Sequence, residues 1–481
     1  MIDVREEQLT PSLATESVVS AGEWGLGTAN LVMALVAWLS PTREALATVV
    51  PVMALLSLLI VIISVSRALR SGHIGHAFLH FGVFVTYWMG FLRLCTSQPA
   101  FASGVFQIAA SVGLLYPLEK VALAAVYVAL FQFTALLGMS LGVPSTLRRM
   151  GRWRWDRPLS TPLLWVIALS AFAAWIPSLV AFRGDVEQAV ARQMAMRSGS
   201  SPSGGFVGLL AHLTHFAQYG TAVGIVLIVV TYGRRSIVLW VGAFTGLVFF
   251  MLQGTRHHML FVAVPVAVYV FRLMVQQRKR KLLALLVCGL LLIGLVYQLQ
   301  TALRERGWRE IGNIDPRDLI AFKGMDHIEA MIFSLVLVPE QHDYFHEAVT
   351  PYFVTHFVPH SWWPSKPFPK FWLYYNQRYT RGDPFNVCPS YIGQSHMTWG
   401  FMGVVIGALW MGWLTRLADT WFHLADAEGQ KLWVIWVGSF YGFLISMHRI
   451  YYPLYFVYPA FAFIAMVFLT VPRPADVPAE P

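Results

Sequence analysis

The chain has 481 residues, of which 57% are hydrophobic and only 12% are charged. Soluble domains carry about 25% charged residues, so this chain has too few charges to cover a water-exposed surface of its size. The composition excludes a water-soluble enzyme, a disordered chain and a nucleic-acid-binding protein. It predicts a polytopic membrane protein.

Twelve apolar segments are long enough, or nearly so, to cross about 30 Å of hydrocarbon as helices. They lie near residues 24–41, 45–66, 73–93, 119–143, 160–182, 206–231, 237–253, 257–274, 282–299, 396–415, 432–448 and 453–471. Residues 97–118 are apolar too, but they are short and interrupted by Pro and Ser, so we expect a re-entrant or interfacial piece. If that piece crossed the membrane, every orientation before it would reverse. The expected fold class is all-α, a polytopic transmembrane bundle of about 12 spans with one large outer loop that contains short helices.

Lys and Arg residues indicate the orientation of this bundle. With both termini in the cytoplasm, 18 of the 35 face the cytoplasm, eight lie in short outer segments and nine lie in the long outer loop. The positive-inside rule applies to short loops, and the ratio of 18 to 8 favours this orientation. The basic runs at 148–157, 234–235 and 278–281 are then mainly topology anchors, which also contact anionic lipid. The net charge of +10 reports orientation, and no nucleic-acid partner is expected.

The predicted organisation has four parts. Residues 1–300 form an N-terminal membrane bundle of about nine spans, and residues 301–395 form the long outer, periplasmic loop. Residues 396–472 form the C-terminal membrane helices, and residues 473–481 are a Pro-rich, disordered tail. Cys95 and Cys388 both fall on the outer face, where a disulfide and free thiols are both open.

The long loop is the expected functional segment, because a loop of this length in a compact protein is usually functional. It opens with a basic cluster that includes Arg304 and Arg306. Asp326 follows, at the start of a stretch whose apolar positions recur with helical spacing. This spacing predicts an amphipathic helix on or in the membrane interface, with an apolar face formed by Ile328, Met331, Ile332 and Leu335.

A run of aromatic residues and prolines follows in the same loop, at residues 359–367. Its four prolines (359, 364, 367 and the neighbouring 369) exclude a regular helix. Trp362 and Trp363 suit either the headgroup layer of the membrane or stacking on sugar rings. Lys366 serves either a phosphate group or the structure of the loop.

A very short outer turn, Gly254-Thr255-Arg256, precedes the eighth span. Thr255 caps a helix N-terminus, which carries free N–H groups and the positive end of the helix dipole. Arg256 in the first turn adds a full positive charge, so the turn is suited to a phosphate group. The alternative is an arginine that extends from a span end toward water.

Histidines also occur within the spans, and their spacing is compatible with one helical face. His212 and His215 lie in the sixth span, and His73, His76 and His80 lie in the third, near its inner end. Neither set has a recognised zinc pattern, so packed, hydrogen-bonded histidines and no metal are expected. Motifs for nucleotide hydrolysis, serine hydrolases and metal-dependent glycosyl transfer do not occur.

Four features together resemble the bacterial oligosaccharide repeat-unit polymerases, also called O-antigen polymerases, which are related to the O-antigen ligases. The first two are the Gly254-Thr255-Arg256 helix start and the long outer loop that opens with arginines. The third is residues 358–367 (VPHSWWPSKP), similar to that family's I-P-R-x-x-W-P-x-K-P run. The fourth is residues 392–403 (IGQSHMTWGFMG), similar to its l-G-E-x-Y-x-N-F-G-x-x-G run. The resemblance covers the last half of the chain best.

This chain departs from the family's pattern at three positions. His360 stands where Arg is usual, Gln394 where Glu is usual and His396 where an aromatic residue is common. If a glutamate at position 394 is the family's base, this chain is inactive or uses another residue.

The resemblance implies a glycosyltransferase of the bacterial inner membrane that needs no nucleotide, metal or other cofactor. It joins two polyprenyl-diphosphate-linked oligosaccharides, with release of polyprenyl diphosphate, and a flippase and a chain-length regulator act in the same pathway. Two physical demands follow, cations for the diphosphate and a base for the attacking hydroxyl. The expected catalytic residues are His396, His360 and Asp326, and the expected substrate-binding residues are Arg256, Arg304, Arg306, Lys366, Trp362, Trp363 and Gln394.

Three other functions remain open. An O-antigen ligase would transfer finished polymer to the lipid A core with the same arginines and loop. A lipid-linked glycan flippase or other transporter would place more charge within its spans. A membrane acyltransferase would use a span histidine such as His212 or His215.

Overall fold

A computed structural model describes residues 19–96, 117–151, 327–347, 370–380, 389–427 and 431–447, together with isolated positions between them. The predicted spans near 160–182, 206–231, 237–253, 282–299 and 453–471, most of the span near 257–274 and the C-terminal tail lie outside the described residues. Every regular element in the described part is helical, and no strand occurs there.

The described helices occupy the predicted segments near 24–41, 45–66, 73–93, 119–143, 396–415 and 432–448. Their bounds are α3 Ala21–Leu39, α4 Arg43–Ser71, α5 Ile74–Val83, the π-helix η1 Phe84–Trp88, α6 Met89–Thr96, α8 Leu118–Ser140, α9 Ser145–Met150, α17 His327–Leu337, α19 Lys370–Thr380, α20 Tyr391–Ala427 and α21 Lys431–Met447. Within the described residues, three helices are long and apolar enough to cross a membrane, namely Glu44–Ser71, Leu118–Ser140 and Tyr391–Ala427.

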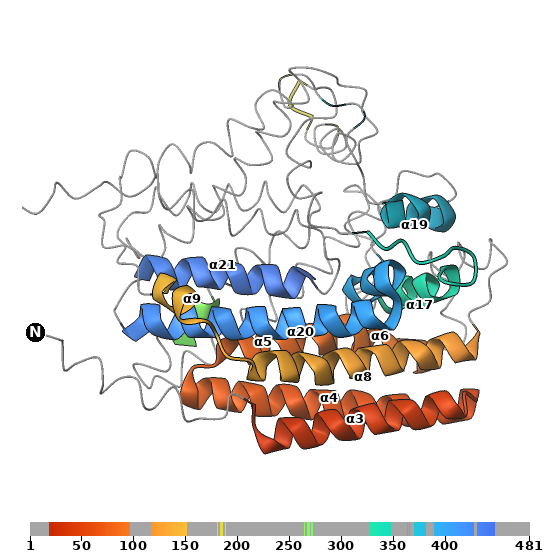
Figure 1. The fold of residues 1–481 in the computed structure, drawn as a ribbon, viewed down its shortest axis with the longest axis horizontal. Coiled ribbons are helices and arrows are strands. Elements are labelled where there is room, and N and C mark those ends of the chain that lie inside the picture. Colours follow the sequence, from red (N-terminus) through yellow and green to blue (C-terminus); the bar gives the residue numbers. More distant parts are fainter. Residues whose placement is uncertain are drawn as a thin grey trace, which may run out of the picture.

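Helix α8 lies at the centre of the described bundle and packs closely on α20 (Figure 1). The crossing depends on glycine. A Cβ atom on Gly138 would lie 2.2 Å from the carbonyl oxygen of Leu409, and one on Gly412 would lie 2.0 Å from that of Ala135. Such close backbone approach is typical of membrane helix pairs, where packing rather than the hydrophobic effect holds helices together.

Polar side chains join α8 to the first two helices inside this apolar bundle. The Asn30 side-chain amide donates to Gln132 Oε1 at 3.4 Å, and Gln132 Nε2 donates to Ser57 Oγ at 3.1 Å. The three residues are buried. This chain of bonds connects α3, α8 and α4. Hydrogen bonds between helices satisfy polar groups that would otherwise stay unpaired in the apolar interior.

The bundle has two distinct ends. Helices α17 and α19, which belong to the predicted outer loop, lie at the end where α6 finishes and α8 begins (Figure 1). The basic helix α9 lies at the other end, where Trp421 Nε1 donates to the carbonyl oxygen of Leu147 at 2.8 Å. The end of α6 and the start of α8 lie at the same end of the bundle, where both helices contact α17 (Figure 1).

Helix α17 forms where an amphipathic helix was predicted, but all of its faces are buried. All residues from Ile328 to Val338 are buried, including Glu329, which is 8% exposed. The helix packs against α8 and α20 instead of lying on a membrane surface. The expectation of an interfacial helix was therefore wrong. The polar face of α17 is covered by neighbouring helices, and the sequence alone does not show which helices those are.

Helix α20 differs from the predicted single span near 396–415. Trp399 and Gly400 have non-helical backbone angles, so residues 391–398 and 401–427 are two helical segments. The first segment folds back on the second, because Tyr391 donates from its hydroxyl to the Gly407 carbonyl at 3.1 Å. A Cβ atom on Gly403 would also lie 2.1 Å from the carbonyl oxygen of Ser395. The straight helix therefore starts after Gly400 and runs to Ala427.

Candidate functional site

The fold-back of α20 contains the motif at residues 392–403, so the geometry of that motif begins with the short segment. Ser390 caps its N-terminus, with Gly393 N–H donating to Ser390 Oγ at 3.1 Å. At the other end, the amides of Phe345 and His346 donate to the carbonyls of Met397 and Thr398 at 3.1 and 2.9 Å. The loop after α17 thereby satisfies carbonyl groups that the interruption of the helix leaves free.

Gly400 allows the change of direction. Its φ of +61° lies in a region that residues with a Cβ rarely adopt. A Cβ atom there would also lie 3.0 Å from Cζ of Tyr344. The third glycine, Gly393, lets α17 approach the short segment, since a Cβ at this position would lie 2.9 Å from Ser334 Oγ.

His396 lies on this short segment and is buried, with 3% of its surface exposed. Its Nε2 atom is 2.7 Å from the carbonyl oxygen of Val338, which follows α17. Its ring lies between those of Tyr127 and Tyr344, at centroid distances of 5.4 and 5.6 Å. The Nδ1 atom of His396 is buried and has no hydrogen-bond partner.

A second unpaired polar atom lies one helical half-turn away from His396. Gln394 is 2% exposed, and its Oε1 atom is buried without a hydrogen-bond partner. Buried polar atoms nearly always have partners, so each exception requires an explanation such as a ligand or a bound water. At this end of the bundle, Lys120 in the first turn of α8 pairs with Glu340, which follows α17, at 2.6 Å.

Exposed aromatic and apolar side chains border the fold-back. Trp399, Phe401 and Met402 are 52%, 48% and 63% exposed, and the ring of His346 lies 5.2 Å from that of Trp399. Trp363 of the Pro-rich run is 40% exposed. These side chains suit lipid contact and stacking on sugar rings equally, as the sequence already left open for Trp363.

The structure describes three of the ten predicted site residues, and two of them share one short helical segment. His396 and Gln394 lie on the same short segment, while Trp363 is described as an exposed residue. The other seven lie outside the described residues, and their predicted roles stay predictions: Asp326, His360, Arg256, Arg304, Arg306, Lys366 and Trp362.

Sequence reasoning did not identify the partners of His396. Tyr127 comes from α8, Tyr344 from the loop after α17, and Val338 contributes only a backbone carbonyl. No local motif carries a contact between segments so far apart in the chain. The glycines at 393, 400 and 403 were the available signal, because closely spaced glycines predict close backbone approach.

Comparison with known proteins returned no family model, no curated protein and no solved structure that matches this chain.

Proposed function

We propose that the chain is a membrane glycosyl polymerase, which joins polyprenyl-diphosphate-linked oligosaccharide repeat units into a surface polysaccharide. The observation that carries the proposal is the fold-back of α20. The segment that resembles a motif of the repeat-unit polymerases, residues 392–403, adopts a specialised backbone and buries a histidine with one unpaired ring nitrogen. A helix that only anchors a chain in the membrane needs neither a broken backbone nor a buried histidine with an unpaired nitrogen.

His396 is in the protonation form that base catalysis needs. A carbonyl oxygen only accepts hydrogen bonds, so the contact with Val338 requires a proton on Nε2 of His396. In the neutral ring, Nδ1 then carries the lone pair. Burial between two tyrosine rings holds the ring in this orientation.

In the proposed reaction, a hydroxyl oxygen of one glycan attacks the anomeric carbon of the other. The bond between that carbon and the diphosphate oxygen breaks, and polyprenyl diphosphate leaves. His396 Nδ1 takes the proton of the hydroxyl, and the Gln394 side-chain oxygen accepts a hydrogen bond from a neighbouring sugar hydroxyl. The residues after α17 cover the ring, so they move when the acceptor glycan reaches it.

The charged residues predicted from the sequence complete the proposal. Arg256, Arg304 and Arg306 neutralise the charge that develops on the leaving diphosphate. Lys120 adds a described cation at the same end of the bundle. Asp326, His360 and Lys366 support these groups, and the tryptophans at 362 and 363 hold the sugars.

The finer membrane arrangement belongs to the same proposal. We place about 12 spans in a bacterial inner membrane, with both termini in the cytoplasm and residues 301–395 in the periplasm. The arrangement of the described helices supports this placement, because α17 and α19 lie at the end opposite the basic helix α9 (Figure 1). A flippase that supplies the lipid-linked substrate and a chain-length regulator are the proposed partners.

The test is the variant His396→Gln, assayed for polymer length and amount by gel electrophoresis of surface glycan, with the variant's level in the membrane measured. The glutamine amide donates to the Val338 carbonyl as the histidine does but provides no base. General-base catalysis typically contributes about 10²–10⁴-fold, so we expect polymer to fall below detection and single repeat units to accumulate.

The matched control is Gln341→Ala, which truncates an exposed side chain in the same loop after α17 and is expected to leave the polymer unchanged. Normal polymer from His396→Gln at a normal protein level contradicts the role of His396. Full-length polymer that is no longer attached to the lipid A core would identify a ligase instead.

A further inference from the structure

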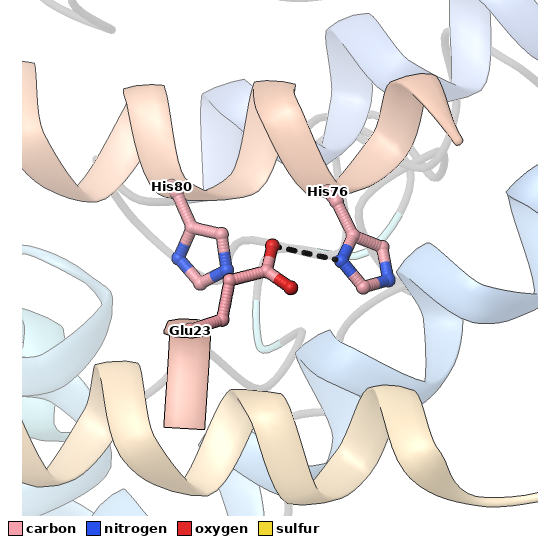
Figure 2. A group of neighbouring side chains, drawn as sticks. All are labelled: Glu23, His76 and His80. Atoms are coloured by element: carbon pink, nitrogen blue, oxygen red, sulfur yellow. Dashed lines mark ion pairs between the residues drawn. The ribbon is translucent and has the colours of Figure 1, made fainter. Parts of the chain in front are cut away.

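Three buried side chains converge at the end of the bundle opposite His396. Glu23 in the first turn of α3 faces His76 and His80, which lie on one face of α5 (Figure 2). The three side chains are 0%, 1% and 0% exposed. Figure 2 shows the carboxylate of Glu23 between the two imidazole rings. The sequence predicts that these histidines are packed and hydrogen-bonded, and only the packing is confirmed.

The two histidines have no hydrogen bonds. All four ring nitrogens of His76 and His80 are buried and without a partner. A neutral imidazole has one N–H donor and one lone pair, so two donors and two acceptors remain unsatisfied in an apolar interior. Such groups cost free energy unless something binds them, and packing alone gives no reason to place two of them together.

Glu23 is, in contrast, fixed in position by a set of hydrogen bonds. Oε2 accepts from Arg67 at 2.7 Å and from the backbone N–H and hydroxyl of Ser20 at 2.7 and 2.8 Å. Oε1 accepts from the hydroxyl of Ser64 at 2.7 Å and faces His76 Nδ1 at 3.7 Å. The carboxylate is therefore preorganised, with one oxygen directed toward the imidazoles.

These distances suit a shared metal ion better than direct hydrogen bonds. The Glu23–His76 separation is too long for a hydrogen bond. Two ligands that lie about 2.0–2.2 Å from one zinc ion are at most about 4.4 Å apart, and this separation falls in that range. One ligand atom from each of the three residues lies within 4.8 Å of the others. Within the part of the chain that the structure describes, this is the only group of three or more potential ligands so arranged.

We propose that Glu23, His76 and His80 bind a divalent transition-metal ion of the zinc class. Imidazole and carboxylate are ligands that such ions prefer, and the i, i+4 spacing of the histidines directs both rings to one side of α5. The ion uses the nitrogen lone pairs, which have no other partner. It joins the start of α3 to α5, whereas the hydrogen bonds of Glu23 with Ser64 and Arg67 join α3 to α4.

Arg67 favours a negatively charged ligand at the remaining coordination position of the metal ion. Its guanidinium already neutralises the charge of Glu23, so the ion's charge is not balanced by its protein ligands. Three protein ligands leave a fourth position, as in zinc sites that bind water or a substrate oxygen. An anionic fourth ligand such as hydroxide offsets one unit of this remaining positive charge. The site is independent of the proposed polymerase reaction, since His396 lies at the other end of the bundle.

The experiment measures metal content directly. The full-length protein is purified in detergent through an affinity tag free of histidine, loaded with Zn²⁺, desalted and analysed by mass spectrometry of the metal. We expect about one zinc per chain in the wild type, and at least a tenfold loss of bound zinc in His76→Phe and His80→Phe. Phenylalanine fills the same space with an apolar ring, so both variants are expected to fold.

The matched control is His73→Phe, which replaces a buried histidine at the start of the same helix outside the three ligands. We expect it to retain zinc. Replacement by Co²⁺ in the wild type gives a second readout, visible d–d absorption of the intensity typical of four-coordinate nitrogen–oxygen ligation, which needs no variant. Absence of stoichiometric zinc and of this absorption in the wild type overturns the proposal, as does unchanged zinc in both phenylalanine variants.

Discussion

At the scale of single residues, Gly400 controls the geometry around His396. In Gly400→Ala, the new Cβ meets the Tyr344 ring, and the backbone keeps a φ of +61° that costs about 1–3 kcal/mol for a residue with a side chain. We therefore expect a lower unfolding temperature in detergent and shorter polymer, because the strain displaces residues 391–398. Thermal unfolding and the surface-glycan gel measure the two effects.

The control for this substitution is Gly25→Ala in α3, where a Cβ meets nothing within 4 Å. Alanine is the better helix former by about 1 kcal/mol, so this variant is expected to be as stable as the wild type or more stable. Equal stability of the two alanine variants would contradict the special role of Gly400.

At this scale, a local motif in the sequence supplies candidate residues, and their roles stay predictions. Residues 392–403 identified His396 and Gln394, because the resemblance rests on neighbouring positions in the chain. The same reasoning expected hydrogen bonds for His76 and His80, which the structure does not have. Glu23 was not connected with them, since the contact depends on where the start of α3 lies relative to α5, and a helix pattern specifies a face but not its neighbour.

At the scale of elements, the crossing of α8 and α20 depends on Gly138 and Gly412. In Gly138→Ala, the Cβ would lie 2.2 Å from the carbonyl oxygen of Leu409, so the two helices must separate. Overpacking typically costs about 1–3 kcal/mol, and here the obstacle is backbone that no side-chain rotation relieves. We expect less protein in the membrane and a lower unfolding temperature.

The comparison variant for this crossing is Gly142→Ala, just beyond the end of α8, where a Cβ meets nothing within 4 Å. It is expected to accumulate and unfold as the wild type does. If Gly138→Ala behaves like Gly142→Ala, the close approach of the two helices is wrong.

Element positions were more predictable from the sequence than element shapes. Apolar runs placed α3, α4, α8 and α21 within a few residues, because hydrophobic length is a strong signal. The fold-back of α20 was not predicted, since residues 391–395 were assigned to the outer loop and the span at 396–415 was expected to be one uninterrupted helix. The interruption depends on a single glycine conformation and on the Phe345 and His346 amides, which come from a distant segment.

At the scale of the whole molecule, the structure shows which of the described helices run parallel and which run antiparallel. The sequence left these directions dependent on whether residues 97–118 cross the membrane. Tyr127 lies near Phe401, and Leu147 lies near Trp421, so α8 and the long segment of α20 run parallel. The start of α5 meets the later part of α20, where Gly75 N–H donates to Asp419 at 2.7 Å. The end of α6 and the start of α8 therefore lie at the same end of the bundle, while residues 97–116 between them lie outside the described residues.

These directions lead to a test of the membrane orientation. In a background with Cys95, Cys288 and Cys388 replaced by serine, single cysteines are introduced as Gln377→Cys in α19 and Ser145→Cys in α9, both at exposed positions. Intact cells are treated with a membrane-impermeant maleimide that passes the outer membrane. We expect labelling of Gln377→Cys, because α19 lies in the proposed periplasmic loop, and labelling of Ser145→Cys only after the inner membrane is permeabilised. The arginines at 148 and 149 favour retention of α9 in the cytoplasm, since positive charge resists translocation in short loops.

Labelling of both positions from the same side would contradict a bundle with these helices at opposite ends. Labelling of Ser145→Cys alone in intact cells would reverse the orientation and place His396 and the arginines at 304 and 306 on the cytoplasmic side.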